Sequence, residues 1–206
     1  GEGKFLNITF FLFFMELLNI TQEVSELKKE LQGYSIIEDK TLIIKTLKIL
    51  INDAIWRRVK DKKIGIAFSG GVDSTLLAFI CHKLGVNFTL YNVGVEGAKD
   101  LEWARKIAAH YNWDLKQKVL SLDEAEEIIC RVVKILPDVN VVKVGVACPE
   151  LVVFEMAKNE ELILGGLGSE EIFAGYERHL KALEENRVNE ECWNGLLGIH
   201  ERDFSR

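Results

Sequence analysis

The chain has 206 residues, of which 48% are hydrophobic, and a formal net charge of −6. A chain of this length forms one domain, or one domain with an appendage, and can bury a core. The acidic balance argues against a broad nucleic-acid footprint, because such a footprint needs a basic domain.

The N-terminal segment 5–14 is apolar and aromatic, but it is shorter than the roughly 20 residues that span a bilayer. It also lacks the basic start and cleavage site of a signal peptide, so we expect no membrane partner. We interpret residues 1–14 as an extension or an artefact of the gene start, with an extra strand or a partner contact as the alternative. Residues 15–60 are expected to form N-terminal helices that pack on the core, over 15–32 and 38–60.

A strand–helix alternation begins at residue 61 and defines the main domain, 61–206. Short apolar runs predict buried strands at 64–68, 88–93, 115–120 and 162–164. Helices are expected at 76–84, 100–111, 122–136 and 149–159, the last with Pro149 at its start, whereas 141–147 fits a strand or a helix. Residues after the last strand look helical. This alternation predicts an α/β fold, a doubly wound parallel sheet with helical N- and C-terminal additions.

The loop 69–75 reads Ser-Gly-Gly-Val-Asp-Ser-Thr and joins the first strand to a helix. Gly70 and Gly71 let an anion approach the main chain, whose N–H groups and following helix N-terminus form an anion site. Hydroxyl donors come from Ser69, Ser74 and Thr75. Asp73 would repel a bare phosphate, so its presence indicates a Mg²⁺ ion between them. No Gly-Lys-Ser/Thr follows, which excludes a Walker loop, and a capped tight turn is the alternative to a phosphate site.

This loop resembles the SGGxDS signature of the ATP pyrophosphatases, or PP-loop enzymes. They include asparagine synthetase, NAD synthetase, GMP synthetase and several tRNA-modifying enzymes. The resemblance implies an adenine nucleotide alpha hydrolase-like fold and cleavage of ATP between its α- and β-phosphates. The loop would hold the departing pyrophosphate while a substrate oxygen becomes adenylated.

A second loop, 164–176, reads Leu-Gly-Gly-Leu-Gly-Ser-Glu-Glu-Ile-Phe-Ala-Gly-Tyr. It resembles the asparagine synthetase motif Ser-Gly-x-Gly-x-Asp-Glu-x-Phe-x-Gly-Tyr, which it matches at Gly166, Gly168, Glu171, Phe173, Gly175 and Tyr176. A helix start with favourable acids is the alternative. The resemblance covers residues 42–179, and the chain is therefore similar to the synthetase domain of an asparagine synthetase-like protein.

Roles follow from the resemblance, position by position. Pyrophosphate would be bound by Ser69, Gly70, Gly71, Asp73, Ser74 and Thr75. The nucleoside would contact the backbone of Ala67, Val93, Gly165 and Gly166. Asp73 and Glu170 would be the metal ligands and the catalytic pair. We expect strands 64–68 and 162–164 to be neighbours, which would bring these two carboxylates to about 4–7 Å from each other when they share Mg²⁺.

Three departures from the motif bear on the reaction. Gly165 replaces a serine and Glu170 replaces an aspartate. Leu167 stands where asparagine synthetases carry a glutamate thought to help deprotonate ammonia, and leucine cannot move a proton. The β-lactam-forming relatives also lack that glutamate. The family also continues beyond this point. The glutamine-hydrolysing domain of those enzymes would begin with a cysteine, whereas this sequence begins with Gly1, so we expect that domain to be absent. We therefore expect an intact ATP half-reaction and an ammonia or amine donor from solution or a separate glutaminase.

The favoured hypothesis is an ATP- and Mg²⁺-dependent amide ligase that activates a carboxylate, such as an amino acid, as an acyl-adenylate. The alternatives are a tRNA-modifying or NAD synthetase-type PP-loop enzyme, and a nucleotide-binding subunit without catalysis. His179, near the second loop, is a further candidate site residue. The four cysteines lack Cys-x-x-Cys spacing, which fits small buried residues and a reducing, cytoplasmic setting.

Overall fold

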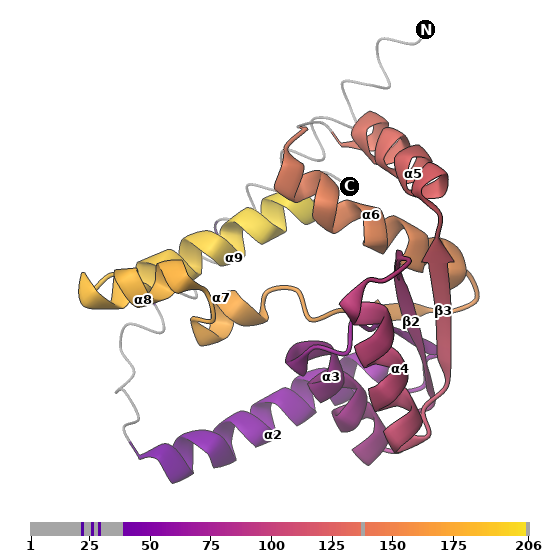
Figure 1. Ribbon diagram of the computed structural model, residues 1–206. Coiled ribbons are helices and arrows are strands. Elements are labelled where there is room, and N and C mark those ends of the chain that lie inside the picture. Colours follow the sequence, from indigo (N-terminus) through magenta and orange to yellow (C-terminus); the bar gives the residue numbers. More distant parts are fainter. Residues whose placement is uncertain (1–21, 23–25, 27–28, 30–38, 137–138, 205–206) are drawn as a thin grey trace, which may run out of the picture. The chain divides into compact units, whose positions relative to one another are not determined.

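The computed structural model describes residues 39–136, 139–204 and the isolated positions 22, 26 and 29 (Figure 1). The predicted extension 1–14 and all but those three positions of the predicted helix 15–32 lie outside the described residues. The chain divides into two compact units, residues 44–167 and residues 168–206 together with 1–43. None of the described helices is long and apolar enough to cross a membrane.

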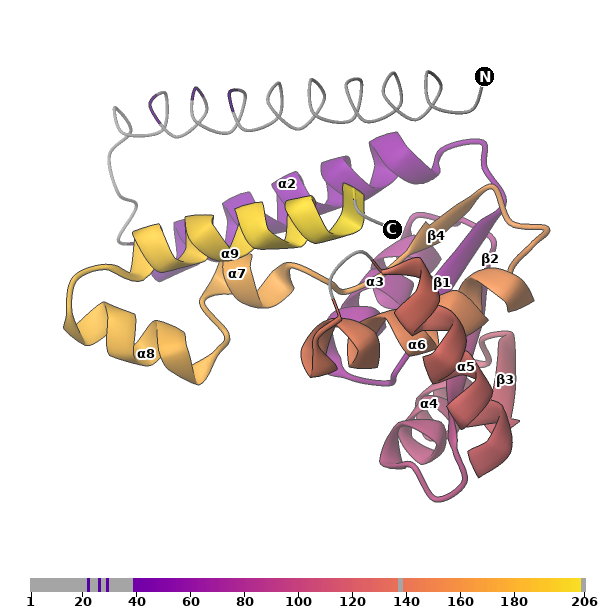
Figure 2. The ribbon, with the colours of Figure 1, turned by 90° about the horizontal axis from the view of Figure 1, so that it is seen from above.

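The larger unit contains a four-stranded, fully parallel sheet with the order β3-β2-β1-β4. Its strands are β1 (Ile64–Ala67), β2 (Phe88–Val95), β3 (Leu115–Leu120) and β4 (Leu162–Leu164). The chain leaves β1 toward β2 and β3 and later returns to the other side of β1, where β4 lies beside it (Figure 2). The predicted doubly wound parallel sheet is confirmed, and so is the expectation that β1 and β4 are neighbours. The strand order reverses at β1, where such sheets bind ligands.

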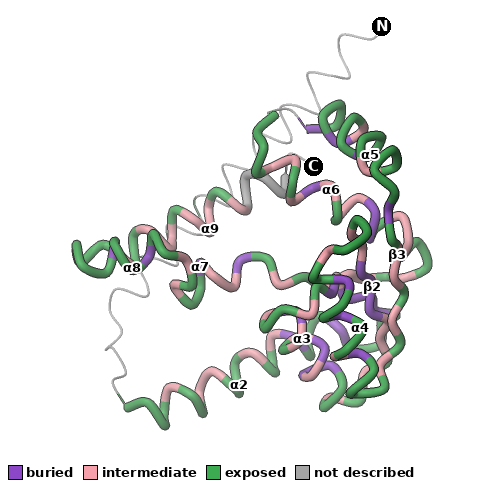
Figure 3. Tube along the Cα trace, in the orientation of Figure 1, coloured by how far each residue is buried: buried purple, intermediate pink, exposed green. Residues whose placement is uncertain are grey.

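Two helical layers cover the sheet because side chains alternate between its faces. One layer contains α2 (Lys40–Val59), α3 (Val72–Lys83) and α4 (Lys99–Tyr111). Its core includes Ile55, Val59, Ile64, Ile66, Phe68, Ala78, Cys81, Leu90, Ala104 and Ala108. The opposite face packs against α5 (Leu122–Ile135) and α6 (Val141–Met156), through Tyr91, Leu120, Ile128, Val132, Val152 and Val153. Figure 3 shows buried positions on β2 and also on helices that cover the sheet, such as α4 and α6.

Two predicted helix starts were wrong. Helix α3 begins at Val72 instead of 76, because Gly71 adopts an extended N-cap conformation and its carbonyl accepts the Thr75 N–H at 3.0 Å. Residues Val141–Met156 form one helix, α6, and Pro149 lies inside it instead of at its start. The N-cap is Asn140, whose Oδ1 accepts the N–H of Val142 at 2.8 Å, a stronger start signal than the proline.

The smaller unit is helical, as predicted for the C-terminal part. It contains α7 (Ser169–Phe173), α8 (Glu177–Glu184) and α9 (Val188–Phe204). Arg178 of α8 connects the three helices, since its guanidinium lies 3.2 Å from Glu171 of α7 and 3.1 Å from Glu191 of α9.

Candidate functional site

The loop after β1 is held by its own hydroxyl groups. Ser69 Oγ accepts the Gly71 N–H at 3.1 Å and lies 3.2 Å from Ser74 Oγ, whose hydroxyl donates to the Gly71 carbonyl at 3.3 Å. Gly70 has φ +78°, a left-handed conformation that favours glycine. The first N–H groups of α3 have no intrahelical acceptor and point toward this loop. The loop is therefore a fixed cradle in which main-chain N–H groups converge at a helix N-terminus.

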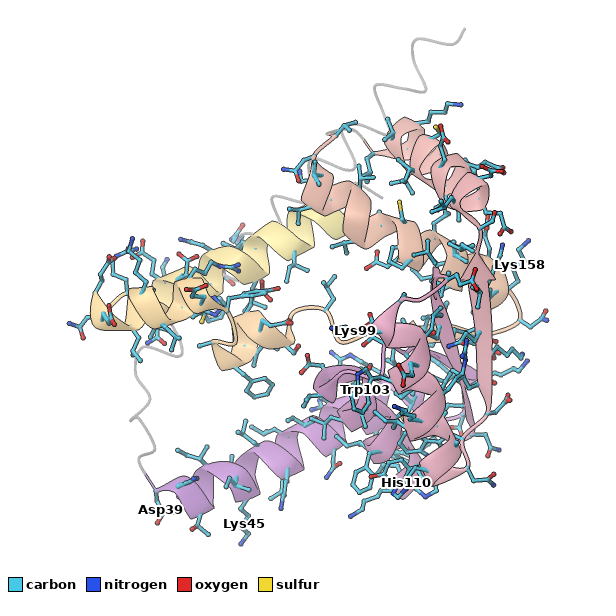
Figure 4. All side chains as sticks on the ribbon, viewed as in Figure 1. Asp39, Lys45, Lys99, Trp103, His110 and Lys158 are labelled. Atoms are coloured by element: carbon cyan, nitrogen blue, oxygen red, sulfur yellow. The ribbon has the colours of Figure 1, made fainter. Side chains whose placement is uncertain are left out.

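Backbone from two other elements lies against this cradle. A Cβ added to Gly70 would come within 2.8 Å of the Trp103 carbonyl carbon and the Ala104 nitrogen of α4. A Cβ added to Gly166, just after β4, would come within 2.9 Å of Asp73 Cβ. Figure 4 labels Lys99 and Trp103 in the first part of α4 and His110 near its end. The structure thus brings together the loop 69–75, the first half of α4 and the loop that follows β4.

The carboxylate of Asp73 is half-buried in the first turn of α3, where the helix dipole favours a negative charge. Within the described part of the chain it has no hydrogen-bond or salt-bridge partner. A carboxylate with free oxygens beside an anion cradle can accept a divalent cation. The described residues contain no group of three or more His, Cys, Asp or Glu side chains that could hold a metal without other ligands.

The residues predicted to contact the nucleoside lie on the same edge of the sheet. Ala67 ends β1, Val93 lies near the end of β2, and Gly165 and Gly166 follow β4. This common edge is the carboxyl end of the parallel strands, the usual place for ligands in this architecture. Their contacts with a nucleoside remain a prediction.

Two hollows adjoin these residues within the larger unit. A groove of about 410 Å³ runs from Gly70 between α3 and α4, and is lined by Val72, Thr75, Leu76, Phe79, Ile107 and Tyr111. A cavity of about 750 Å³ shares Val93 with the nucleoside set and continues over mainly apolar side chains such as Leu120, Ile128, Val141 and Val144. Its volume lies in the range of small-molecule sites.

The second predicted loop lies partly in the smaller unit, where its two acids differ. Glu170 is half-buried, and its Oε2 accepts a hydrogen bond from Ser169 Oγ at 3.2 Å. Glu171 is 4% exposed, pairs with Arg178, and has a buried Oε2 without a hydrogen-bond partner among the described residues. Glu171 is therefore a structural anchor, whereas Glu170 is less buried and forms no ion pair among the described residues. Because Asp73 and Glu170 belong to different units, their shared metal site remains a prediction.

Two other candidates have distinct surroundings. Leu167 is 43% exposed in the loop after β4 and supplies no proton-transfer group there. His179 is 1% exposed, and its Nδ1 accepts the backbone N–H of Tyr176 at 3.2 Å. His179 thus holds the start of α8, which gives it a structural role in the smaller unit.

Comparison with known proteins gives consistent matches. The asparagine synthase family model matches residues 46–203. The putative asparagine synthetase [glutamine-hydrolyzing] 1 of Methanocaldococcus jannaschii is 38% identical over 150 residues, which is 71% of this chain and 27% of that protein. The human asparagine synthetase [glutamine-hydrolyzing] is 31% identical over 171 residues, covering 78% of this chain and 30% of that protein. The chain thus spans less than a third of the length of these relatives.

Solved structures give weaker similarity. The NH3-dependent NAD synthetase from Campylobacter jejuni aligns with 18% identity and a TM-score of 0.46, over 77% of this chain and 84% of that one. The NMN synthetase from Francisella tularensis aligns with 16% identity and a TM-score of 0.45, over 61% of this chain and 57% of that one. At this level of similarity neither carries an argument about function.

Proposed function

Because this chain belongs to the asparagine synthase family, we propose that it carries the ATP-dependent half of an amide ligase. In the first step a substrate carboxylate oxygen forms a bond to the α-phosphorus of ATP. The bond between that phosphorus and the oxygen leading to the β-phosphate breaks, and pyrophosphate leaves. In the second step an ammonia or amine nitrogen attacks the acyl carbon of the adenylate, and AMP leaves with the bond's electron pair.

The observation that carries this proposal is the internally bonded loop at the carboxyl end of β1. The internal bonds of Ser69, Gly71 and Ser74 fix the loop before a ligand arrives. The main-chain N–H groups at the start of α3 can therefore neutralise the charge that develops on departing pyrophosphate with little reorganisation. We assign pyrophosphate to residues 69–75. Ala67, Val93, Gly165 and Gly166 share the same sheet edge, which supports their assignment to the nucleoside.

The residues present also fit a magnesium ion. The carboxylates of Asp73 and Glu170 are hard oxygen ligands of the kind that Mg²⁺ prefers, and Mg²⁺ commonly takes one or two carboxylates together with substrate phosphates. When bound, the ion would offset the negative charge of the leaving pyrophosphate. Asp73 would meanwhile hold it beside the cradle.

The acceptor half of the reaction differs from that of an asparagine synthetase with a glutamate at the position of Leu167. An attacking ammonium must lose a proton, and Leu167 cannot take it. We infer that the nitrogen nucleophile either arrives unprotonated or loses its proton to another base. The cavity next to Val93 has mainly apolar walls, so apolar carboxylic acids are candidate substrates in addition to amino acids.

The test is ATP–pyrophosphate exchange with a panel of carboxylates that includes aspartate, other amino acids and apolar acids. Exchange that requires one carboxylate and Mg²⁺ is the expected result. Hydrolysis of ATP to ADP and phosphate would contradict the proposal.

A nucleotide-binding role without catalysis is the second candidate, and Leu167 is the observation that favours it. In that case the protein would bind ATP or AMP with Mg²⁺ in calorimetry. It would show no exchange with any carboxylate of the panel.

A further inference from the structure

Asn92 is a polar residue in the middle of an apolar strand. It is 3% exposed and lies between Tyr91 and Val93 of β2. A buried amide is costly unless its hydrogen bonds are satisfied, so its partners indicate what it does. Its Nδ2 donates to the Phe68 carbonyl at 2.7 Å, and its Oδ1 accepts from Gln117 Nε2 at 2.7 Å.

The bond to Phe68 lies at the end of the β1–β2 ladder. The paired register of these strands ends at Ala67 and Tyr91, and the Phe68 N–H still bonds to the Tyr91 carbonyl at 2.8 Å. The Phe68 carbonyl receives its donor from the Asn92 side chain. Phe68 directly precedes Ser69, so this bond fixes the peptide that opens the phosphate loop.

The other side of Asn92 is fixed by β3 and α4. Gln117 stands opposite Asn92 in the β2–β3 register. Its Nε2 also donates to the Leu101 carbonyl at 3.0 Å, and its Oε1 accepts from Arg105 Nε. The side-chain amides of Gln117 and Asn92 thus form a continuous chain of hydrogen bonds from α4 to Phe68.

The same helix also touches the loop directly. Gly70 packs against the α4 backbone at Trp103 and Ala104, within one turn of Leu101 and Arg105. Helix α4 is therefore linked to the loop in two ways: the side-chain amides of Gln117 and Asn92 connect it to Phe68, and Gly70 packs against its backbone. This network favours one geometry, because displacing the buried Asn92 amide leaves its polar atoms unpaired.

We propose that Asn92 and Gln117 are positioning residues that set the conformation of the phosphate loop. They contact neither nucleotide nor metal, and act through the Phe68 carbonyl and α4. This inference rests on the proposed function only because it takes residues 69–75 as the phosphate site. The effect of Asn92 and Gln117 on the geometry of the loop does not depend on that function.

Tyr91 offers a matched control. It is the next residue along β2, its side chain points to the opposite face, and its hydroxyl donates a 2.5 Å hydrogen bond to Glu160. Tyr91→Phe and Asn92→Leu each remove side-chain hydrogen bonds from the same strand, but only the Asn92 side chain is bonded to Phe68, the residue before the loop. Gln117→Leu is a second variant, because Gln117 is half-buried and its loss disturbs the core less.

The experiment compares the three variants by amide chemical shifts and hydrogen exchange at Ser69, Gly70 and Gly71, and by calorimetric binding of pyrophosphate and of ATP with Mg²⁺. We expect Asn92→Leu and Gln117→Leu to shift these amides and speed their exchange, and Tyr91→Phe to leave them unchanged. Dissociation constants should rise about tenfold in Asn92→Leu, the factor that corresponds to ~1.4 kcal/mol, and less in Gln117→Leu.

Unchanged loop amides in Asn92→Leu and Gln117→Leu, or equal changes in Tyr91→Phe, would overturn the positioning role. If the loop amides respond as expected but the native protein binds neither pyrophosphate nor ATP, the positioning role stands and the proposed function fails. If the native protein binds both ligands but the loop amides do not respond to Asn92→Leu, the positioning role fails and the proposed function stands.

Discussion

Gly166 offers the sharpest steric test of the site, because its neighbour Gly165 is a built-in control. A Cβ at Gly166 would lie 2.9 Å from Asp73 Cβ and 3.5 Å from the Ser74 nitrogen, whereas a Cβ at Gly165 meets nothing within 4 Å. Neither glycine has a positive φ, so an alanine at either position adds a methyl group without the backbone strain of a left-handed conformation. The first turn of α3 must move to admit the Gly166→Ala methyl group.

Overpacking of this kind costs about 1–3 kcal/mol. We expect Gly166→Ala to lower the unfolding free energy by that amount in urea titrations, and Gly165→Ala to change it by less than about 0.5 kcal/mol. Since the displaced turn carries Asp73 and Ser74, the KM for ATP in the exchange assay should rise about tenfold or more in Gly166→Ala, by the equivalence of 1.4 kcal/mol to a factor of ten. Equal stability of the two alanine variants, with an unchanged KM for ATP, would refute the close approach of this loop to α3.

Two further predictions concern pKa shifts. Burial, together with the hydrogen bond to Glu160 and the charge of Glu160, raises the pKa of Tyr91 to about 12, so folding favours the neutral phenol. The stability that this group contributes is complete below its unfolded pKa of about 10 and is lost as the pH rises toward 12. Between pH 9 and pH 11.5 the unfolding free energy in urea should therefore fall more steeply in the native protein than in Tyr91→Phe, and parallel losses would contradict the assignment. Burial also raises the pKa of the Cys81 thiol to about 11. Iodoacetamide at pH 8 should therefore label the exposed Cys130 well before Cys81, as followed by mass spectrometry. Labelling of Cys81 at a comparable rate would contradict its burial in a stable core.

The sequence was sufficient for the sheet and for the position of the glycine loop between β1 and α3. Apolar runs and glycine punctuation are local signals, and they predicted all four strands and the adjacency of β1 and β4. The start of α3 is not evident from the sequence, because the residues of its first turn, Val72 to Thr75, have the chemistry of a loop. Pro149 misled for a related reason, since a proline inside a helix is rare and is more typical of a helix start.

The supporting contacts could not be predicted, because they depend on register. Asn92 and Gln117 are 25 residues apart in sequence, and only the β2–β3 pairing places them opposite each other. In the same way, the sequence motif presents Glu170 and Glu171 as a pair of acids. Burial against Arg178 separates the structural Glu171 from the accessible Glu170.

The proposed function requires that this protein cleave ATP between its α- and β-phosphates at the loop after β1. Phosphorus NMR of the products formed from ATP, with Mg²⁺ and the carboxylate panel, tests it most directly in the native protein and in Asp73→Asn. We predict AMP and pyrophosphate from the native protein. Asp73→Asn should be slower by about a hundredfold or more, with unchanged circular dichroism, because this side chain is half-exposed and has no partner in the described structure. ADP and phosphate as products, or equal rates from the two proteins, would contradict the account.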